Sequence, residues 1–377
     1  MAPFLLGMLL GLVVLAAGSF YAFDLKLWIE AEPTPTPSPS PTPPRAKPHL
    51  EAAVRYEDEG RLEDALAEYE RAVDAEPNVA EAYIGWATLL TYRRDPSEAV
   101  KKAQKAVELA PSSAEAYSVL AVAHDWNGDP DQAIIFAREA LELDPNLAEA
   151  HAYLAEAYAD KYKLAEATEA VQKALSLNPK SVAALRVKGY IHEVQAEYTQ
   201  AASEYSRAVE LAPNAPYLHL MLGNALKAAK DFDKAILQYQ RATDLDPKDP
   251  RAPAGVGSCY YALESYDKAE ERLKAALAID PNYAAPLGQL AMVYYVQKRY
   301  VDAIPYFLRA IELEKSKPKL TSYRHALGWS LLAEKRYQEA REQFTKVLEL
   351  DPELQGAKQG LEAVKKAEAD AKEGTSH

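Results

Sequence analysis

Seven histidines and a single cysteine are the side chains of this 377-residue chain whose chemistry is most typical of catalysis and metal binding. No two of the histidines share one face of an expected helix at the spacing of metal ligands. The chain also has neither a glycine-rich phosphate loop nor a GxSxG nucleophile motif. We therefore expect a protein that is not an enzyme and that needs no metal and no cofactor. The histidines are His49, His124, His151, His192, His219, His325 and His377.

The cysteine and the net charge exclude further classes. One cysteine cannot build a disulfide framework, and Cys259, beside Tyr260 in an expected helix, is predicted to be a small buried hydrophobe rather than a reactive thiol. The net charge is −13, from 56 Asp and Glu against 43 Lys and Arg. An acidic protein repels phosphate, so nucleic acid is not expected as a partner.

The first 30 residues have the pattern of a membrane anchor. Pro3 to Phe23 contain no charged side chain, and 21 helical residues at about 1.5 Å each span about 31 Å, the thickness of the hydrocarbon core of a bilayer. The alternative is a cleaved signal peptide, which the lack of a basic residue before the apolar stretch disfavours. Lys26 is the only basic residue close behind the span, whereas acidic residues dominate there. We therefore expect a single-pass protein whose remainder is extracytoplasmic.

Residues 31–45 are predicted to form a stalk. Within them the run PTPTPSPSPTPP has seven prolines in twelve residues, which cannot continue a helix or a sheet. In polyproline II geometry such a run reaches about 37 Å. We expect it to hold the following domain away from the lipid headgroups.

A 34-residue repeat occupies the rest of the chain. Seven prolines recur at this spacing, an eighth follows after 37 residues and a ninth after another 34. With each proline at position 32, position 20 is alanine in all nine units, and position 8 is always alanine or glycine. The units then begin at Ala46, Ala80, Ala114, Ala148, Val182, Pro216, Pro250, Ala284 and Thr321.

Within each unit two stretches have apolar residues at three- and four-residue spacing, and turn formers lie between them. In the second unit, for example, Tyr83, Trp86 and Leu90 follow this spacing. Each unit is therefore predicted to be a helical hairpin. Small residues at positions 8, 20 and 27 let the helices approach closely.

These columns, with an aromatic residue often at position 11 or 24, resemble the tetratricopeptide repeat. The resemblance implies an all-α, right-handed solenoid of nine hairpins over residues 46–354, making about one full superhelical turn, with the first helices lining a concave groove. Residues 355–377 are predicted to be a capping helix and tail. Three residues inserted before Pro318 are expected to lengthen the second helix of the eighth unit or to widen its loop, and Pro305 is expected inside that second helix.

The resemblance also implies which residues face the groove, namely positions 2, 5, 6, 9, 12 and 13 of each unit. Aromatic residues at such positions favour binding of an extended or helical protein segment, because they offer a large contact area at a small entropic cost. The alternative is that several of them pack between neighbouring helices. The predicted groove residues are Tyr92, Trp126, Tyr153, Arg186, Tyr190, Asn224, Lys227, Tyr295 and Trp329.

Charge is unevenly distributed over these groove positions. The first four units carry acidic residues there, among them Asp125, Glu156 and Asp160, whereas Arg186 and Lys227 follow in the middle units. An acidic half would attract basic segments of a partner. For glutamates in the first helical turn, such as Glu149, the alternative is a favourable interaction with the helix dipole.

The leading hypothesis is a membrane-anchored scaffold in an envelope assembly, secretion or biogenesis complex. The alternatives are a cytoplasm-facing adaptor or regulatory subunit of a membrane enzyme, and a solenoid that self-associates end to end. Relatives that bind the C-terminal carboxylate of heat-shock chaperones use Lys and Asn at positions 5 and 9 of their first unit. Leu50 and Val54 occupy these positions here, so that role is not expected.

Overall fold

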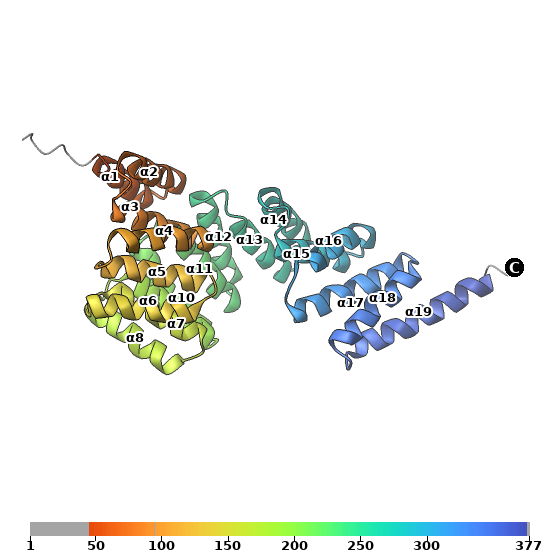
Figure 1. Cartoon of the computed structure of the whole chain (residues 1–377). Coiled ribbons are helices and arrows are strands. Elements are labelled where there is room, and N and C mark those ends of the chain that lie inside the picture. The colour runs from red at the N-terminus through yellow and green to blue at the C-terminus, as the bar shows by residue number, and fades with distance from the viewer. Residues whose placement is uncertain (1–44, 94, 375–377) are drawn as a thin grey trace, which may run out of the picture. The chain divides into compact units, whose positions relative to one another are not determined.

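The computed structural model describes residues 45–93 and 95–374, and the side chains up to residue 371. These residues form nineteen α-helices and no strand, which confirms the predicted all-α solenoid (Figure 1). The helices are α1 (Lys47–Asp58), α2 (Leu62–Ala75), α3 (Ala80–Tyr92), α4 (Pro96–Leu109), α5 (Ala114–Trp126), α6 (Pro130–Leu143), α7 (Ala148–Asp160), α8 (Leu164–Leu177), α9 (Val182–Val194), α10 (Tyr198–Leu211), α11 (Pro216–Ala228), α12 (Phe232–Leu245), α13 (Arg251–Ala262), α14 (Tyr266–Ile279), α15 (Ala284–Val296), α16 (Tyr300–Leu313), α17 (Lys317–Ala333), α18 (Tyr337–Leu350) and α19 (Gln355–Gly374).

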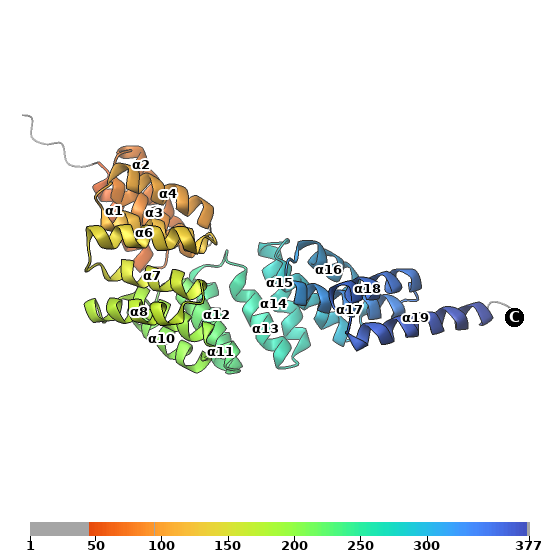
Figure 2. The same ribbon diagram turned by 60° about the horizontal axis from the view of Figure 1, so that its bottom comes forward.

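Helices α1 to α18 form nine hairpins, in each of which an odd-numbered first helix packs against an even-numbered second helix. Six of the first helices begin at the residue where a repeat unit was predicted to begin, for example Ala80 and Ala114. Helix α19 follows the ninth hairpin and packs on α18 and α17 (Figure 2).

The predicted transmembrane helix and most of the stalk fall in residues 1–44, outside the described residues. Within the part of the chain that the structure describes, no helix combines the length and the apolar composition needed to cross a bilayer.

The small-residue columns explain how closely the helices pack. The alanines at position 20 are all fully buried in the nine hairpins. In three of the four units with glycine at position 8, an aromatic ring of the second helix lies over it, and in the seventh unit Leu273 lies over Gly257: a Cβ on Gly189 would be 2.7 Å from the ring of Tyr205. The hairpins therefore approach at distances that larger side chains would prevent.

The three-residue insertion has a different effect from the two that were expected. Helix α16 keeps 14 residues and the loop after it is not widened, but α17 has 17 residues and begins at Lys317 rather than at the predicted Thr321. Proline is tolerated in the first helical turn, so the Pro318 that marks the repeat also starts this helix early. Pro305 lies inside α16, as predicted.

The solenoid curves more tightly in its N-terminal units than the resemblance implies. The expectation that nine units make about one full turn is wrong, because the first two hairpins already meet α11, the loop before it and the loop after α12. The first helices α3, α5, α7 and α9 approach one another more closely than the first helices of later units. Buried alanines such as Ala121, Ala152 and Ala155 permit this approach, which shortens the inner side of the stack.

Candidate binding cleft on the inner wall

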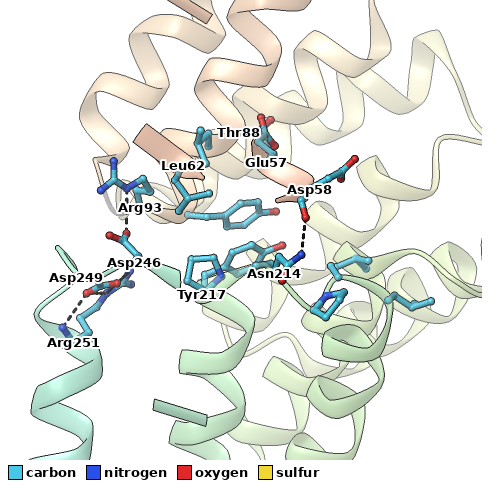
Figure 3. A pocket seen from close by; sticks show the side chains of 18 residues that line it. Glu57, Asp58, Leu62, Thr88, Arg93, Asn214, Tyr217, Asp246, Asp249 and Arg251 are labelled. Atoms are coloured by element: carbon cyan, nitrogen blue, oxygen red, sulfur yellow. Dashed lines mark hydrogen bonds and ion pairs between the residues drawn. The ribbon is translucent and has the colours of Figure 1, made fainter. Parts of the chain in front are cut away.

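The N-terminal units close against the middle units through a few side chains (Figure 3). The rings of Tyr92 on α3 and Tyr217 on α11 stack with their centroids 4.1 Å apart and their planes 7° apart. The side-chain amide of Asn214 donates to the backbone carbonyl of Asp58 at 2.7 Å. These contacts border a pocket of about 350 Å³ between the two parts of the stack.

Two ion pairs add to this closure. Arg93 at the end of α3 pairs with Asp246 after α12 at 3.4 Å (Figure 3). Glu63 on α2 pairs with Lys248 after α12 at 3.2 Å, and its contact with Arg93 at 3.0 Å lies within the N-terminal units. The pairs at Glu63 lie on the surface, where each contributes on the order of 1 kcal/mol or less. We therefore infer that the stacked tyrosines contribute most of the free energy that stabilises this closure.

Behind the closure, side chains from three more first helices fill the interior. The guanidinium of Arg186 is 0% exposed and donates to both carboxylate oxygens of Glu156 at 2.5 Å. It also lies 5.6 Å from the ring centroid of Tyr92 and 5.7 Å from that of Trp126. The hydroxyls of Tyr92 and Tyr153 are 3.3 Å apart. A charge this deeply buried is tolerated because it is paired and lies against aromatic rings.

Three predicted groove residues, Tyr92, Tyr153 and Arg186, are thus buried among first helices in this conformation. The alternative raised from the sequence, that such residues pack between neighbouring helices, applies to these three. Whether they also contact a partner stays a prediction.

A cleft of about 660 Å³ opens beside this cluster and is lined almost entirely by first helices, α5, α7, α9, α11, α13 and α15. Four predicted groove residues line it, namely Trp126, Tyr190, Asn224 and Lys227. Their side chains are half-buried or exposed rather than covered. We call this space the inner cleft.

One side of the inner cleft is acidic. Asp125 on α5 and Glu156 and Asp160 on α7 line it together, and the hydroxyl of Tyr190 donates to Asp160. Burial, followed by the charges of Glu156 and Asp160, raises the pKa of Asp125 to about 9. Burial also raises the pKa of Asp160, against the hydrogen bond from Tyr190. Asp125 is therefore protonated at neutral pH.

The residues that α11 and α13 contribute to the inner cleft include two basic ones. Lys227 on α11 lies 5.9 Å from the ring centroid of Tyr239, and burial lowers the pKa of its ammonium group. The hydroxyl of Tyr239 donates to Oδ1 of Asn224 at 2.6 Å, which holds this amide at the cleft surface. Arg251 at the start of α13 lines the cleft too and pairs with Asp249.

Comparison with known proteins decides the family. A family model described as tetratricopeptide repeat matches residues 84–148, 147–216 and 220–284, and a second model with the same description matches residues 282–353. The chain belongs to the tetratricopeptide repeat family. None of the curated proteins matches it.

Two of the solved structures that are similar to this chain align as follows. The crystal structure of the APC/C hetero-tetramer Cut9–Hcn1 aligns with a TM-score of 0.65 and 16% identity, over 85% of this chain and 66% of that chain. The Pseudomonas aeruginosa protein pilF aligns with a TM-score of 0.47 and 22% identity, over 56% of this chain and 96% of that chain. The first similarity shows the fold alone, and this chain spans only 66% of the length of that neighbour.

The remaining predicted groove residues lie in later tetratricopeptide units, away from the inner cleft. Tyr295 on α15 is half-buried, with its ring centroid 6.0 Å from that of Tyr300. The indole nitrogen of Trp329 donates to Nε2 of His325 at 3.1 Å, and its ring meets Phe344 edge to face. The structure does not bring these two residues together with the other seven.

Two of the described histidines contact the preceding unit, and the cysteine is buried. His151 and His219, both at position 4 of their units, each place Nε2 about 3 Å from the carbonyl of the proline that ends the preceding unit. Burial raises the pKa of the Cys259 thiol to about 11. In the described part of the chain no cluster of His, Cys, Asp and Glu could hold a metal ion.

Sequence reasoning missed Tyr217 as a site residue. It occupies position 2 of its unit, a groove position, but nothing in the sequence shows that α3 lies opposite it. The sequence predicted an excess of acidic residues along the first half of the groove. It did not predict that these residues meet at one cleft. The signal was present as acidic residues 31 and 35 positions apart, near the 34-residue period, which places them on adjacent first helices.

Proposed function

We propose that this chain is a scaffold that binds an extended or helical segment of a partner protein in the inner cleft. Tetratricopeptide repeat proteins generally mediate protein–protein interactions. The observation that carries the proposal is the inner cleft itself, in which Trp126 and Tyr190 stand beside polar groups that can orient a bound backbone. Half-buried aromatic residues next to fixed polar groups are typical of binding sites.

The proposal includes a place at a membrane. Residues 1–30 would form one transmembrane helix, and the proline-rich stalk would hold the repeats on the extracytoplasmic side, in an envelope assembly, secretion or biogenesis complex. This part rests on the apolar stretch Pro3 to Phe23 and on the charge pattern behind it. The proposed role is binding without catalysis.

Photocrosslinking tests the binding site. Benzoylphenylalanine in place of Tyr190 is expected to capture a discrete partner in cells, because this side chain lines the inner cleft. The matched control replaces Tyr162, which is 79% exposed and lies in the turn between α7 and α8. Equal capture from both positions, or none from Tyr190, would contradict a cleft-binding scaffold.

Cysteine labelling tests the sidedness. Cys259 is buried, so an added cysteine at Lys101, whose side chain is 72% exposed, is the suitable probe. With a membrane-impermeant maleimide we expect modification of Lys101→Cys in intact cells and none in the parent chain. Modification only after lysis would overturn the extracytoplasmic arrangement and favour the cytoplasm-facing adaptor.

A further inference from the structure

We propose that the acidic side of the inner cleft binds a lysine or arginine side chain of the partner segment, with Asp125 and Asp160 as its carboxylate ligands. The proposal rests on the proposed function and adds the chemistry of the partner to it. It is carried by an unpartnered buried carboxyl group, by the distribution of charge around it and by the aromatic rings beside it.

The unpartnered group is Asp125. Its side chain is only 4% exposed, and it lines the inner cleft. Its Oδ1 atom is buried and has no hydrogen-bond partner among the described residues. A buried carboxyl oxygen without a donor is costly, and a donor entering the cleft from a bound segment would remove that cost.

The neighbouring carboxylates differ in how far they are already satisfied. Glu156 accepts two hydrogen bonds from Arg186 and one at 3.1 Å from the indole nitrogen of Trp126, so its charge is balanced within the protein. Asp160 accepts one hydrogen bond, from Tyr190 to Oδ1. Acceptor capacity therefore remains at Asp125 and Asp160, on the same side of the cleft.

The charge balance around the pair favours a cation. Arg186 is the cation that acts on Asp125, and it is already bound to Glu156. The two aspartates thus share a site in which their own repulsion and burial oppose ionisation. An incoming ammonium or guanidinium group would stabilise both ionised carboxylates.

The surroundings favour an organic cation over a metal ion. The described residues contain no group of His, Cys, Asp and Glu able to hold a metal. Trp126 and Tyr190 border the same space, and aromatic rings bind ammonium and guanidinium groups through their faces. Arg186 already lies over Trp126 in this manner, which shows that the geometry is available at this wall.

The test is a peptide selection on the full chain in detergent micelles, with a random peptide library displayed on phage as the probe. Parallel selections use D125N, D160N and, as a matched control, D131N, whose aspartate is exposed on α6 outside the cleft. A fifth selection uses Asn224→Trp, which fills the inner cleft with an uncharged side chain. Circular dichroism confirms that each variant is folded.

We expect lysine or arginine at a fixed position of the peptides selected by the parent and by D131N. D125N should weaken binding of such a peptide at about pH 8 by roughly tenfold, the effect of losing one charge-assisted hydrogen bond. In the parent, replacing the basic residue of the peptide by citrulline or norleucine should weaken binding about as much as the D125N substitution does. In D125N the same replacement should weaken binding much less.

Three results would overturn the inference in different ways. Peptides that depend on the cleft, as shown by loss of binding to Asn224→Trp, but carry no basic preference would refute the cation site and leave the scaffold proposal intact. Peptides that bind Asn224→Trp as well as the parent would refute both proposals. Equal loss in D125N and D131N would also refute the cation site, since a general charge effect would then explain it.

Discussion

At the residue scale, Asp125 is a carboxyl group that the folded chain keeps protonated at neutral pH. Its pKa is raised to about 9 by burial and by the carboxylates of Glu156 and Asp160, which outweigh Arg186. In the unfolded chain the same group titrates near pH 4. Between these two values the unfolded chain has released the proton while the folded chain still holds it, so stability falls as pH rises through this window.

We therefore predict that D125N loses less stability than the parent as the pH rises from about 5 to about 8. One such group changes the free energy of unfolding by at most about 1.4 kcal/mol per pH unit. Thermal unfolding at the two pH values should show a smaller decrease in Tm for D125N than for the parent. D131N serves as the control, because the exposed Asp131 should leave the decrease unchanged. Parallel curves for D125N and the parent would show that Asp125 is ionised at neutral pH.

The cluster around Arg186 shows how much of a side-chain arrangement can be predicted from the sequence. Position within the repeat predicted that Tyr153, Arg186 and Trp126 face the groove. In the structure Trp126 lines the inner cleft, whereas Tyr153 and Arg186 are buried between first helices. Their mutual distances depend on how closely successive first helices approach. That approach depends on the whole set of small residues between the helices, so no single position predicts it.

At the element scale, each of the eight hairpin turns whose residues are all described places one residue in the left-handed region. Glycine fills this position in two turns, at Gly60 and Gly128, with φ of 75° and 84°. Six other turns use a residue with a side chain, namely Tyr162, Ala196, Lys230, Glu264, Lys298 and Lys335. A side chain at positive φ costs roughly 1–2 kcal/mol. These six turns therefore contain backbone strain that a substitution by glycine would remove.

Ala196→Gly should accordingly stabilise the chain, and Gly128→Ala should destabilise it, each by about 0.5–1 kcal/mol after the entropy of glycine in the unfolded state is included. A Cβ on Gly128 would meet nothing within 4 Å, so the second change tests the backbone alone. Chemical denaturation of both variants measures the two effects. If both substitutions changed the free energy of unfolding in the same direction, positive φ would not determine the stability of these turns.

A second prediction concerns the pair formed by positions 8 and 24. In the fifth unit Gly189 lies beneath the fully buried ring of Tyr205, whereas the fourth unit combines Ala155 with Val171. Gly189→Ala should cost about 1–3 kcal/mol through overpacking, despite the better helix propensity of alanine. Adding Tyr205→Val, which reproduces the combination of the fourth unit, should remove the overpacking. The free energies of unfolding of both single variants and the double variant give the coupling, and additive effects would contradict the proposed contact.

The hairpins themselves were predictable because each unit repeats the same local solution. Alanine at position 20 is buried in every hairpin, and the unit starts at Ala80 and Ala114 coincide with helix starts. The exception is the insertion before Pro318. The 34-residue register placed the unit start at Thr321, but the local preference of proline for a first helical turn began α17 at Lys317.

At the scale of residues 45–374, curvature is the property that the repeat pattern did not predict. Each unit adds a small rotation, so small differences accumulate until α3 meets α11. The contacts that result, such as Arg93 with Asp246 and Asn214 with Asp58, join residues more than 150 positions apart. Helical periodicity carries no information about such pairs, and the location of the inner cleft follows from them.

The last prediction tests whether the stacked tyrosines hold this closure. Tyr217→Ala removes the ring that stacks on Tyr92 and should cost about 2–4 kcal/mol of the contact between the two parts of the stack. The ion pairs that remain across the closure, Arg93 with Asp246 and Glu63 with Lys248, should not hold it alone. Spin labels at Glu51 on α1 and Lys234 on α12, both exposed, report the distance by electron–electron double resonance. We expect a longer and broader distance distribution in Tyr217→Ala, whereas Tyr261→Ala, which removes a tyrosine contact within the seventh hairpin, should leave the distribution unchanged. An unaltered distribution in folded Tyr217→Ala would show that close packing of α3, α5, α7 and α9 sets the curvature without the stack.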